Sequence, residues 1–111
     1  MNSNKSIIIT ATPLRVSFAG GGTDIENYYK HHTGCVLSTT INKYIYVTVK
    51  EHGELFEEPI RLNYSDTEIV DHIDDIKNNI ARECIKLLDV KPPIYISTIA
   101  DLPAKSGLGS S

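Results

Sequence analysis

Three features that mark other protein classes are scarce in this sequence. It has only two cysteines, Cys35 and Cys84, which lack both the density of a disulfide scaffold and the spacing of metal ligands. Basic residues are not in excess, since the formal net charge is −3, and this argues against a nucleic-acid-binding surface. The apolar run near the start, Ile7 to Ile9, is too short for a signal peptide or a membrane helix. We therefore expect buried, reduced cysteines, a cytoplasmic location, and neither nucleic acid nor membrane as a partner.

The remaining composition is that of an ordinary folded protein. Apolar residues make up 41% of the chain and charged residues 23%, as in soluble globular domains. A length of 111 residues corresponds to one domain or less. No internal repeat and no linker divides the chain, so residues 1–111 are treated as a single unit.

The strands are predicted from β-branched residues and from alternation of apolar and polar side chains. Strand-like runs occupy residues 7–16, 15–19, 35–41, 44–51, 60–64 and 94–99. Pro13 is expected to break or bend the first run. Asn42 and Lys43 are expected to form a tight hairpin between the two runs that flank them.

Two segments favour helices. Ile25–His32 has room for about two turns after residues that suit a helix N-cap. Apolar residues at three- and four-residue steps from Ile73 to Leu88 predict a longer amphipathic helix, for which Ser65, Asp74 and Asp75 are all credible starting points. Strands that alternate with helices indicate an α+β layered fold.

The final segment, Pro103–Ser111, carries the most specific chemistry. Gly107 and Gly109 flank a leucine, and two serines follow where a helix should begin. Glycines let the backbone approach a ligand closely, and free N–H groups at a helix start bind phosphate. A serine hydroxyl at the same place can reach a phosphate-bound Mg²⁺. The residues alone therefore predict a phosphate-binding loop.

Two other types of phosphate loop fit poorly. A Walker loop requires a Gly-Lys pair, which is absent. A dinucleotide fingerprint requires a third glycine and an acidic residue about 20 positions later, and the chain does not extend that far. For the earlier Gly20–Gly22 turn, that acidic residue would fall at residues 40–44, where none occurs.

Two motifs resemble those of the galactokinase, homoserine kinase, mevalonate kinase and phosphomevalonate kinase (GHMP) family. The pattern Pro-x-x-x-Gly-Leu-Gly-Ser-Ser at Pro103–Ser111 is similar to the family's second motif. Pro13–Asp24 (PLRVSFAGGGTD) resembles the first motif, which galactokinases write as Pro-Gly-Arg-Val-Asn-Leu-Ile-Gly-Glu-His-Thr-Asp. The variant Ala-Gly-Gly-Gly-Thr-Asp and the Cys35–Val49 region are most similar to D-glycero-D-manno-heptose 7-phosphate kinases and related fucose kinases.

The resemblance implies a fold. It is an α+β domain of the GHMP kinase N-terminal type, with a mixed sheet and a left-handed βαβ crossover, truncated within the ATP-binding motif. Residues 1–111 would then be part of that domain, and the catalytic base would lie beyond them. We expect the chain alone to lack kinase activity and to bind ATP poorly, and its uncovered sheet edges to favour homo-oligomers.

The resemblance also implies roles for individual residues. Arg15 would be catalytic, close to the transferring phosphoryl group. A sugar would bind to Gly20, Gly21, Gly22, Thr23 and Asp24, with the Asp24 carboxylate accepting hydrogen bonds from sugar hydroxyls. ATP would bind to Pro103, Lys105, Ser106, Gly107, Leu108, Gly109, Ser110 and Ser111, and Ser111 would also hold Mg²⁺.

The implied activity is ATP-dependent phosphorylation of the anomeric hydroxyl of D-glycero-D-manno-heptose 7-phosphate, which gives the 1,7-bisphosphate. The partner would be a small-molecule sugar phosphate, and the cofactors ATP and Mg²⁺. Another GHMP kinase, for fucose or in the mevalonate pathway, and a non-catalytic truncated module are the alternatives. The sequence does not select among acceptor sugars.

Overall fold

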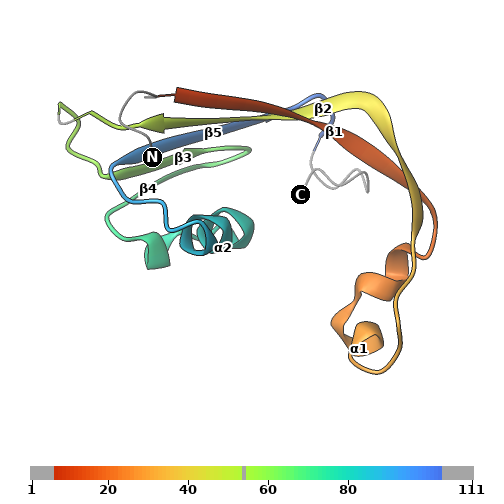
Figure 1. Ribbon diagram of the computed structural model, residues 1–111. Coiled ribbons are helices and arrows are strands. Elements are labelled where there is room, and N and C mark those ends of the chain that lie inside the picture. The colour runs from red at the N-terminus through yellow and green to blue at the C-terminus, as the bar shows by residue number, and fades with distance from the viewer. Residues whose placement is uncertain (1–6, 54, 104–111) are drawn as a thin grey trace. The chain divides into compact units, whose positions relative to one another are not determined.

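The computed structural model describes residues 7–53 and 55–103 (Figure 1). Its elements in chain order are β1 (Ile7–Ala19), the 3-10 helix η1 (Gly21–Asp24), α1 (Glu26–Tyr29), β2 (Leu37–Glu51), β3 (Ile60–Asn63), β4 (Thr67–Val70), the 3-10 helix η2 (Ile73–Asp75), α2 (Asn79–Leu87) and β5 (Ile94–Ala100). The strands form a five-stranded sheet in the order β1-β2-β5-β3-β4. β3 pairs antiparallel with β4 and parallel with β5. The predicted α+β class with a mixed sheet is confirmed.

The chain divides into two compact units, which we describe separately. Of the described residues, 7–11, 46–53 and 55–99 belong to the first unit, and 12–45 and 100–103 belong to the second. None of the helices in the described part of the chain is long and apolar enough to cross a membrane.

The core of the first unit lies between β3, β5 and α2. Alternate residues of a strand face the same side of a sheet, and Ile60 of β3 pairs in register with Ile94 of β5. Both side chains are fully buried. The other buried members of this core are Leu62, Ile76, Ile85 and Ile96. The parallel pair β3 and β5 is thus held together by isoleucines and leucine on the face that α2 covers.

The second predicted helix is shorter than its apolar period suggested. α2 begins at Asn79, and its N-cap is Asn78, whose side-chain Oδ1 accepts a hydrogen bond from the Ala81 N–H at 3.1 Å. The predictions that the helix begins at Ser65, Asp74 or Asp75 are therefore wrong. The aspartates lie in η2 instead, and residues 67–70 form β4.

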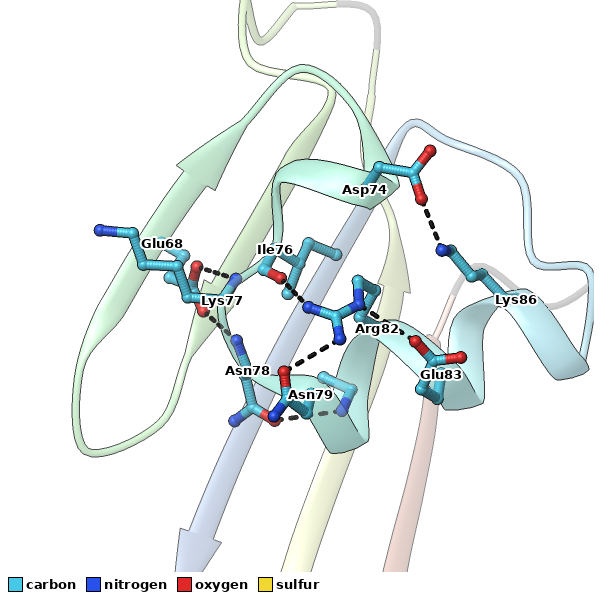
Figure 2. A network of polar contacts seen from close by, with 10 residues as sticks. Glu68, Asp74, Ile76, Lys77, Asn78, Asn79, Arg82, Glu83 and Lys86 are labelled. Atoms are coloured by element: carbon cyan, nitrogen blue, oxygen red, sulfur yellow. Dashed lines mark hydrogen bonds and ion pairs between the residues drawn. The ribbon is translucent and has the colours of Figure 1, made fainter.

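A buried carboxylate explains where α2 begins. Glu68 of β4 accepts hydrogen bonds from the backbone N–H groups of Lys77 at 2.7 Å and Asn78 at 3.0 Å, and from the Tyr64 hydroxyl at 2.8 Å. Figure 2 shows its carboxylate against these two N–H groups. The N–H groups that would continue a helix from η2 are therefore bound to Glu68. The chain is extended at Ile76, with ψ at 122°, before α2 begins.

Arginine side-chain contacts fix the same connection from the helix side. Arg82 of α2 donates from Nη1 to the Ile76 carbonyl at 2.8 Å and from Nη2 to Asn79 Oδ1 at 2.9 Å (Figure 2). Lys86, one turn later, forms an ion pair with Asp74 of η2. The connection between β4 and α2 is thus bound by hydrogen bonds on both sides.

The long strands pass through both positions where the sequence predicted an interruption. β1 continues through Pro13, and β2 continues through Asn42 and Lys43. β1 lies at the edge of the sheet, where a proline that lacks an N–H need not break a ladder hydrogen bond. In β2, the Tyr44 N–H donates to Asp101 Oδ2 at 2.8 Å and the Tyr44 carbonyl accepts from the Asp101 N–H at 2.9 Å. These contacts hold Tyr44 extended, and the predicted hairpin is wrong.

The expectation of buried cysteines is also wrong, because Cys35 and Cys84 are both exposed. Cys84 lies one turn after Ile80 on α2, and Ile80 is 56% exposed. The apolar residues of this helix therefore fall on two faces. One, which includes Ile85, packs on the sheet, and the described residues do not cover the other.

Candidate active site

A hollow of about 390 Å³ lies in the second unit, around the turn that follows β1. Residues from β1, η1, α1 and the segment before β2 line it: Arg15, Ser17, Gly20, Gly21, Thr23, Asp24, Tyr29, Gly34, Cys35 and Val36. Arg15 and Asp24, which the sequence assigned to phosphate and sugar, are therefore brought together in one cavity.

The arginine reaches the hollow because of the pleat of β1. Arg15 and Ser17 are two residues apart and therefore face the same side of the strand, and both line the hollow. Leu14, which faces the opposite side, is only 2% exposed. Burial of Leu14 thus orients the strand so that the guanidinium and the serine hydroxyl face the cavity.

The turn after β1 requires glycine at one position. Gly20 has φ of +84°, in the left-handed region, and a Cβ there would lie 1.9 Å from the Cys35 carbonyl oxygen. Only glycine fits such a conformation next to another backbone. Gly34 is also near the turn, since a Cβ there would make a tight contact of 3.0 Å with the Thr23 carbonyl oxygen. The two segments that form the walls of the hollow therefore cross with almost no space between them.

The Thr23 side chain joins these two segments. Its Oγ1 lies 2.7 Å from the Gly20 carbonyl, to which it donates, and it accepts a hydrogen bond from the Cys35 N–H at 3.1 Å. The Thr23 N–H also donates to the Gly20 carbonyl, at 3.0 Å. The turn is thus closed on itself and bonded to the segment that precedes β2.

The two charged residues that line the hollow, Arg15 and Asp24, have no polar partner among the described residues. Within residues 7–53 and 55–103, neither the Arg15 nor the Asp24 side chain forms a hydrogen bond or an ion pair. A guanidinium offers five donors and a carboxylate accepts on two oxygens. The hollow therefore presents one strong donor group and one strong acceptor group to a ligand, which suits a polyhydroxylated, phosphorylated molecule.

The lining includes residues that the sequence analysis did not assign to a site. Ser17 could have been found from its two-residue spacing to Arg15. Tyr29 could not be separated from Tyr28 by pattern, but the structure distinguishes them. Tyr29 lines the hollow and is 55% exposed, whereas Tyr28 contacts His32 in a tilted ring pair with centroids 5.4 Å apart.

Some predicted site residues are not part of this cavity. Gly22 does not line the hollow, and a Cβ there would have nothing within 4 Å. Pro103 is described and exposed. Lys105, Ser106 and Gly107–Ser111, which carry the predicted ATP and Mg²⁺ sites, lie outside the described residues. Among the residues that are described, no group of three or more His, Cys, Asp or Glu side chains could hold a metal ion.

Two solved structures that share this fold are named as sugar kinases. No family model matches the chain. A D-glycero-D-manno-heptose 1-phosphate kinase from Bacteroides thetaiotaomicron superposes with a TM-score of 0.65 and 27% identity, over 94% of this chain and 37% of that one. A candidate sugar kinase from Campylobacter jejuni superposes with a TM-score of 0.61 and 31% identity, over 94% of this chain and 36% of that one.

A curated relative is named as a heptose 7-phosphate kinase. The chain is 38% identical over 113 aligned positions to the D-glycero-alpha-D-manno-heptose 7-phosphate kinase of Campylobacter jejuni, an alignment that covers 94% of this chain and 33% of that protein. The resemblance to heptose phosphate kinases that the motifs predicted is confirmed. The chain spans about a third of the length of the relatives that it matches.

Proposed function

We propose that this chain provides the acceptor site of an ATP-dependent sugar kinase. The proposed reaction transfers the γ-phosphoryl group of ATP to the anomeric hydroxyl of D-glycero-D-manno-heptose 7-phosphate and yields the 1,7-bisphosphate. The observation that carries this proposal is the meeting of Arg15 and Asp24, both without partners among the described residues, in one hollow. The 38% identity to a heptose 7-phosphate kinase supports the choice of sugar.

The chemistry of the hollow suits the two parts of this reaction. Asp24 would accept hydrogen bonds from neighbouring sugar hydroxyls. Gly20 and Gly21, which line the hollow, would leave room for the sugar because they have no side chains. Arg15 would stabilise the negative charge that spreads over the phosphoryl oxygens in transfer. Catalysis would then rest on positioning and electrostatics.

ATP and Mg²⁺ are assigned to the end of the chain. Backbone N–H groups and hydroxyls suit phosphate oxygens and Mg²⁺, and the donor set of Pro103, Lys105, Ser106 and Gly107–Ser111 has this chemistry without any carboxylate side chain. When bound, ATP supplies the phosphoryl group and Mg²⁺ neutralises its charge. Ser111 is the proposed Mg²⁺ ligand.

The proposal also includes the type of domain, its location in the cell and its oligomeric state. Residues 1–111 would form part of a GHMP kinase N-terminal domain. The parallel pair β3 and β5, connected through α2, would be its left-handed crossover. The enzyme would act in the cytoplasm. Homo-oligomers could form through the sheet edge at β1 or β4.

A sugar 1-phosphate is the second candidate acceptor. The Bacteroides thetaiotaomicron structure is named as a heptose 1-phosphate kinase, whereas the Campylobacter jejuni relative is named as a heptose 7-phosphate kinase. In the first case the hydroxyl that receives the phosphoryl group would differ from the anomeric one. Among the described residues that line the hollow, Arg15 is the one basic side chain, and it could contact the phosphate of either acceptor.

An acceptor panel tests the proposal directly. The intact protein would be incubated with ATP, Mg²⁺ and one of heptose 7-phosphate, heptose 1-phosphate, fucose or mevalonate, and ADP release would be measured. We expect the 7-phosphate to give the highest kcat/KM and the product to carry the new phosphate at the anomeric position. Asp24→Asn should raise KM for the sugar, and Arg15→Lys should lower kcat. The assignment of this hollow as the acceptor site would be refuted by ADP release that no acceptor stimulates. It would also be refuted if Asp24→Asn left acceptor-dependent ADP release unchanged.

A further inference from the structure

We propose that Thr23 is a positioning residue, whose hydroxyl fixes the sugar-binding turn to the segment before β2 and so fixes Asp24. In this role the hydroxyl acts through Asp24 and does not contact the sugar. The proposal rests on the proposed function, because it takes Asp24 as the sugar-binding carboxylate. We call the hydrogen bonds of Thr23 Oγ1 to Gly20 and Cys35 the Thr23 link.

The hydrogen-bonding capacity of the hydroxyl is largely used within the protein. A threonine hydroxyl has one proton and two lone pairs. The proton is directed to the Gly20 carbonyl at 2.7 Å, and one lone pair accepts the Cys35 N–H at 3.1 Å. The Cys35 carbonyl lies 3.2 Å from the same oxygen and competes for that one proton. The donor that a sugar hydroxyl would need is therefore already engaged.

This side chain is also the bonded connection between the two walls of the hollow. In the part of the chain that the structure describes, every hydrogen bond between residues 20–25 and residues 34–36 includes Thr23 Oγ1. The other close approaches, at Gly20 and Gly34, are packing contacts that glycine makes possible. Without the hydroxyl, the two backbones would remain adjacent but no longer bonded.

Asp24 depends on this connection because it follows Thr23 directly. The Asp24 side chain has no hydrogen bond or ion pair within residues 7–53 and 55–103. Its direction is therefore set by the backbone of η1, which ends at Asp24. A turn that loosens at Thr23 would let the carboxylate leave the orientation in which it meets a sugar, and small displacements of a positioning group reduce catalysis strongly.

Two substitutions separate the hydroxyl from the rest of the side chain. Thr23→Val keeps the branched shape but removes the hydroxyl, whereas Thr23→Ser keeps the hydroxyl and removes a methyl group. In the intact enzyme we expect Thr23→Val to raise KM for the acceptor sugar about tenfold, the factor that corresponds to one net hydrogen bond. KM for ATP should not change, and Thr23→Ser should restore KM for the sugar to near the wild-type value.

A matched control comes from the same unit. Within the part of the chain that the structure describes, the Thr39 hydroxyl donates to the carbonyl of the next residue, Thr40, at 3.3 Å and has no other hydrogen bond. Thr39→Val removes the same group from the same residue type, and should leave both KM values unchanged. A general effect of replacing threonine by valine in this unit would appear in the control as well.

Amide hydrogen exchange gives a second readout that does not need activity. The Cys35 N–H is bound to Thr23 Oγ1, so it should exchange faster in Thr23→Val and remain protected in Thr23→Ser. Faster exchange together with the rise in KM for the sugar supports the proposal. Unchanged exchange in Thr23→Val overturns it, as does a Thr23→Ser enzyme that behaves like Thr23→Val.

The two readouts also separate this proposal from the proposed function. If Thr23→Val raises KM for the sugar while the Cys35 N–H stays protected, the hydroxyl binds the sugar directly and the positioning role is refuted. If the wild-type enzyme shows no sugar-dependent activity, the proposed function fails. In that case exchange at Cys35 decides by itself whether the Thr23 link exists.

Discussion

The carboxylate of Glu68 offers a sharp test of how the first unit is held together. Glu68 is only 8% exposed, and its two oxygens accept hydrogen bonds from Lys77, Asn78 and Tyr64. Glu68→Gln keeps the size of the side chain but replaces one acceptor oxygen by an NH₂ group. The NH₂ group of the glutamine would then face at least one of the groups that donate to Glu68 in the wild type.

The expected loss follows from these contacts. A hydrogen bond to a charged group contributes about 1.5–3 kcal/mol, and a buried donor left without a partner costs about 1–3 kcal/mol. We therefore expect Glu68→Gln to lower the free energy of unfolding by about 2 kcal/mol at neutral pH. The exposed Glu83 of α2, whose one partner among the described residues is Arg82, is the matched control, and Glu83→Gln should cost less than about 0.5 kcal/mol.

The effect should depend on pH in a definite direction. Burial by itself would raise the pKa of Glu68, but the hydrogen bonds from Lys77, Tyr64 and Asn78 and the charge of Lys77 outweigh it, so that the pKa is lowered from its ordinary value of 4.5. A carboxylate whose pKa is lowered by folding stabilises the protein above its unfolded pKa. That contribution is lost as the pH falls through the folded pKa.

Urea unfolding of wild-type, Glu68→Gln and Glu83→Gln proteins, followed by circular dichroism, would measure both effects. The difference in free energy of unfolding between wild type and Glu68→Gln should be largest at neutral pH and should shrink below about pH 4. A difference at neutral pH no larger than that of Glu83→Gln would refute the reasoning. So would a difference that stays constant as the carboxylate becomes protonated.

Three further substitutions probe the second unit and the start of α2. Gly20→Ala should destabilise the protein by more than about 2 kcal/mol in urea unfolding, since it combines a left-handed residue with a backbone clash, whereas Gly22→Ala, which meets open space, should cost little. Tyr29→Leu should raise KM for the sugar severalfold, because an exposed ring is lost from the hollow, while Tyr28→Leu should leave this KM unchanged. Asn78→Ala removes the N-cap of α2 and should lower thermal stability by about 1 kcal/mol, and equal melting temperatures would contradict the cap.

The strands were predictable where local pattern and tertiary environment agree. β3 and β5 alternate apolar and polar residues because one face packs on the core, and that alternation is visible in the sequence. The hairpin at Asn42 and Lys43 was predicted wrongly because the extended backbone at Tyr44 is held by Asp101, a partner far away in the sequence. A local pattern contains no information on such a contact.

The helix after β4 shows a similar limit. The apolar period correctly predicted a helix. However, the N–H groups of Lys77 and Asn78 donate to Glu68, and α2 therefore begins only at Asn79. β4 itself was missed because Ser65 before it and Asp74 and Asp75 after it were all credible helix starts. The local pattern thus predicted that α2 is a helix, whereas the buried carboxylate of Glu68 determines where it begins.

At the candidate site, motif residues were predictable and their neighbours were not. Arg15 and Asp24 follow from the first motif, and the structure brings both to one hollow. The Thr23 link and the contribution of Tyr29 depend on how the segment at Gly34 and Cys35 crosses the turn. That crossing is a tertiary feature, and no spacing within the motif reveals it.

The two neighbouring glycines of the turn differ in what they would tolerate. A Cβ at Gly20 would collide with a carbonyl, but a Cβ at Gly21 would only make an ordinary contact of 3.9 Å with Ser17, at the wall of the hollow. A larger residue at position 21 would therefore occupy cavity volume while leaving the turn intact. If the proposed function holds, a substitution at this one position would fit the hollow to a smaller acceptor while the Gly20 turn is kept.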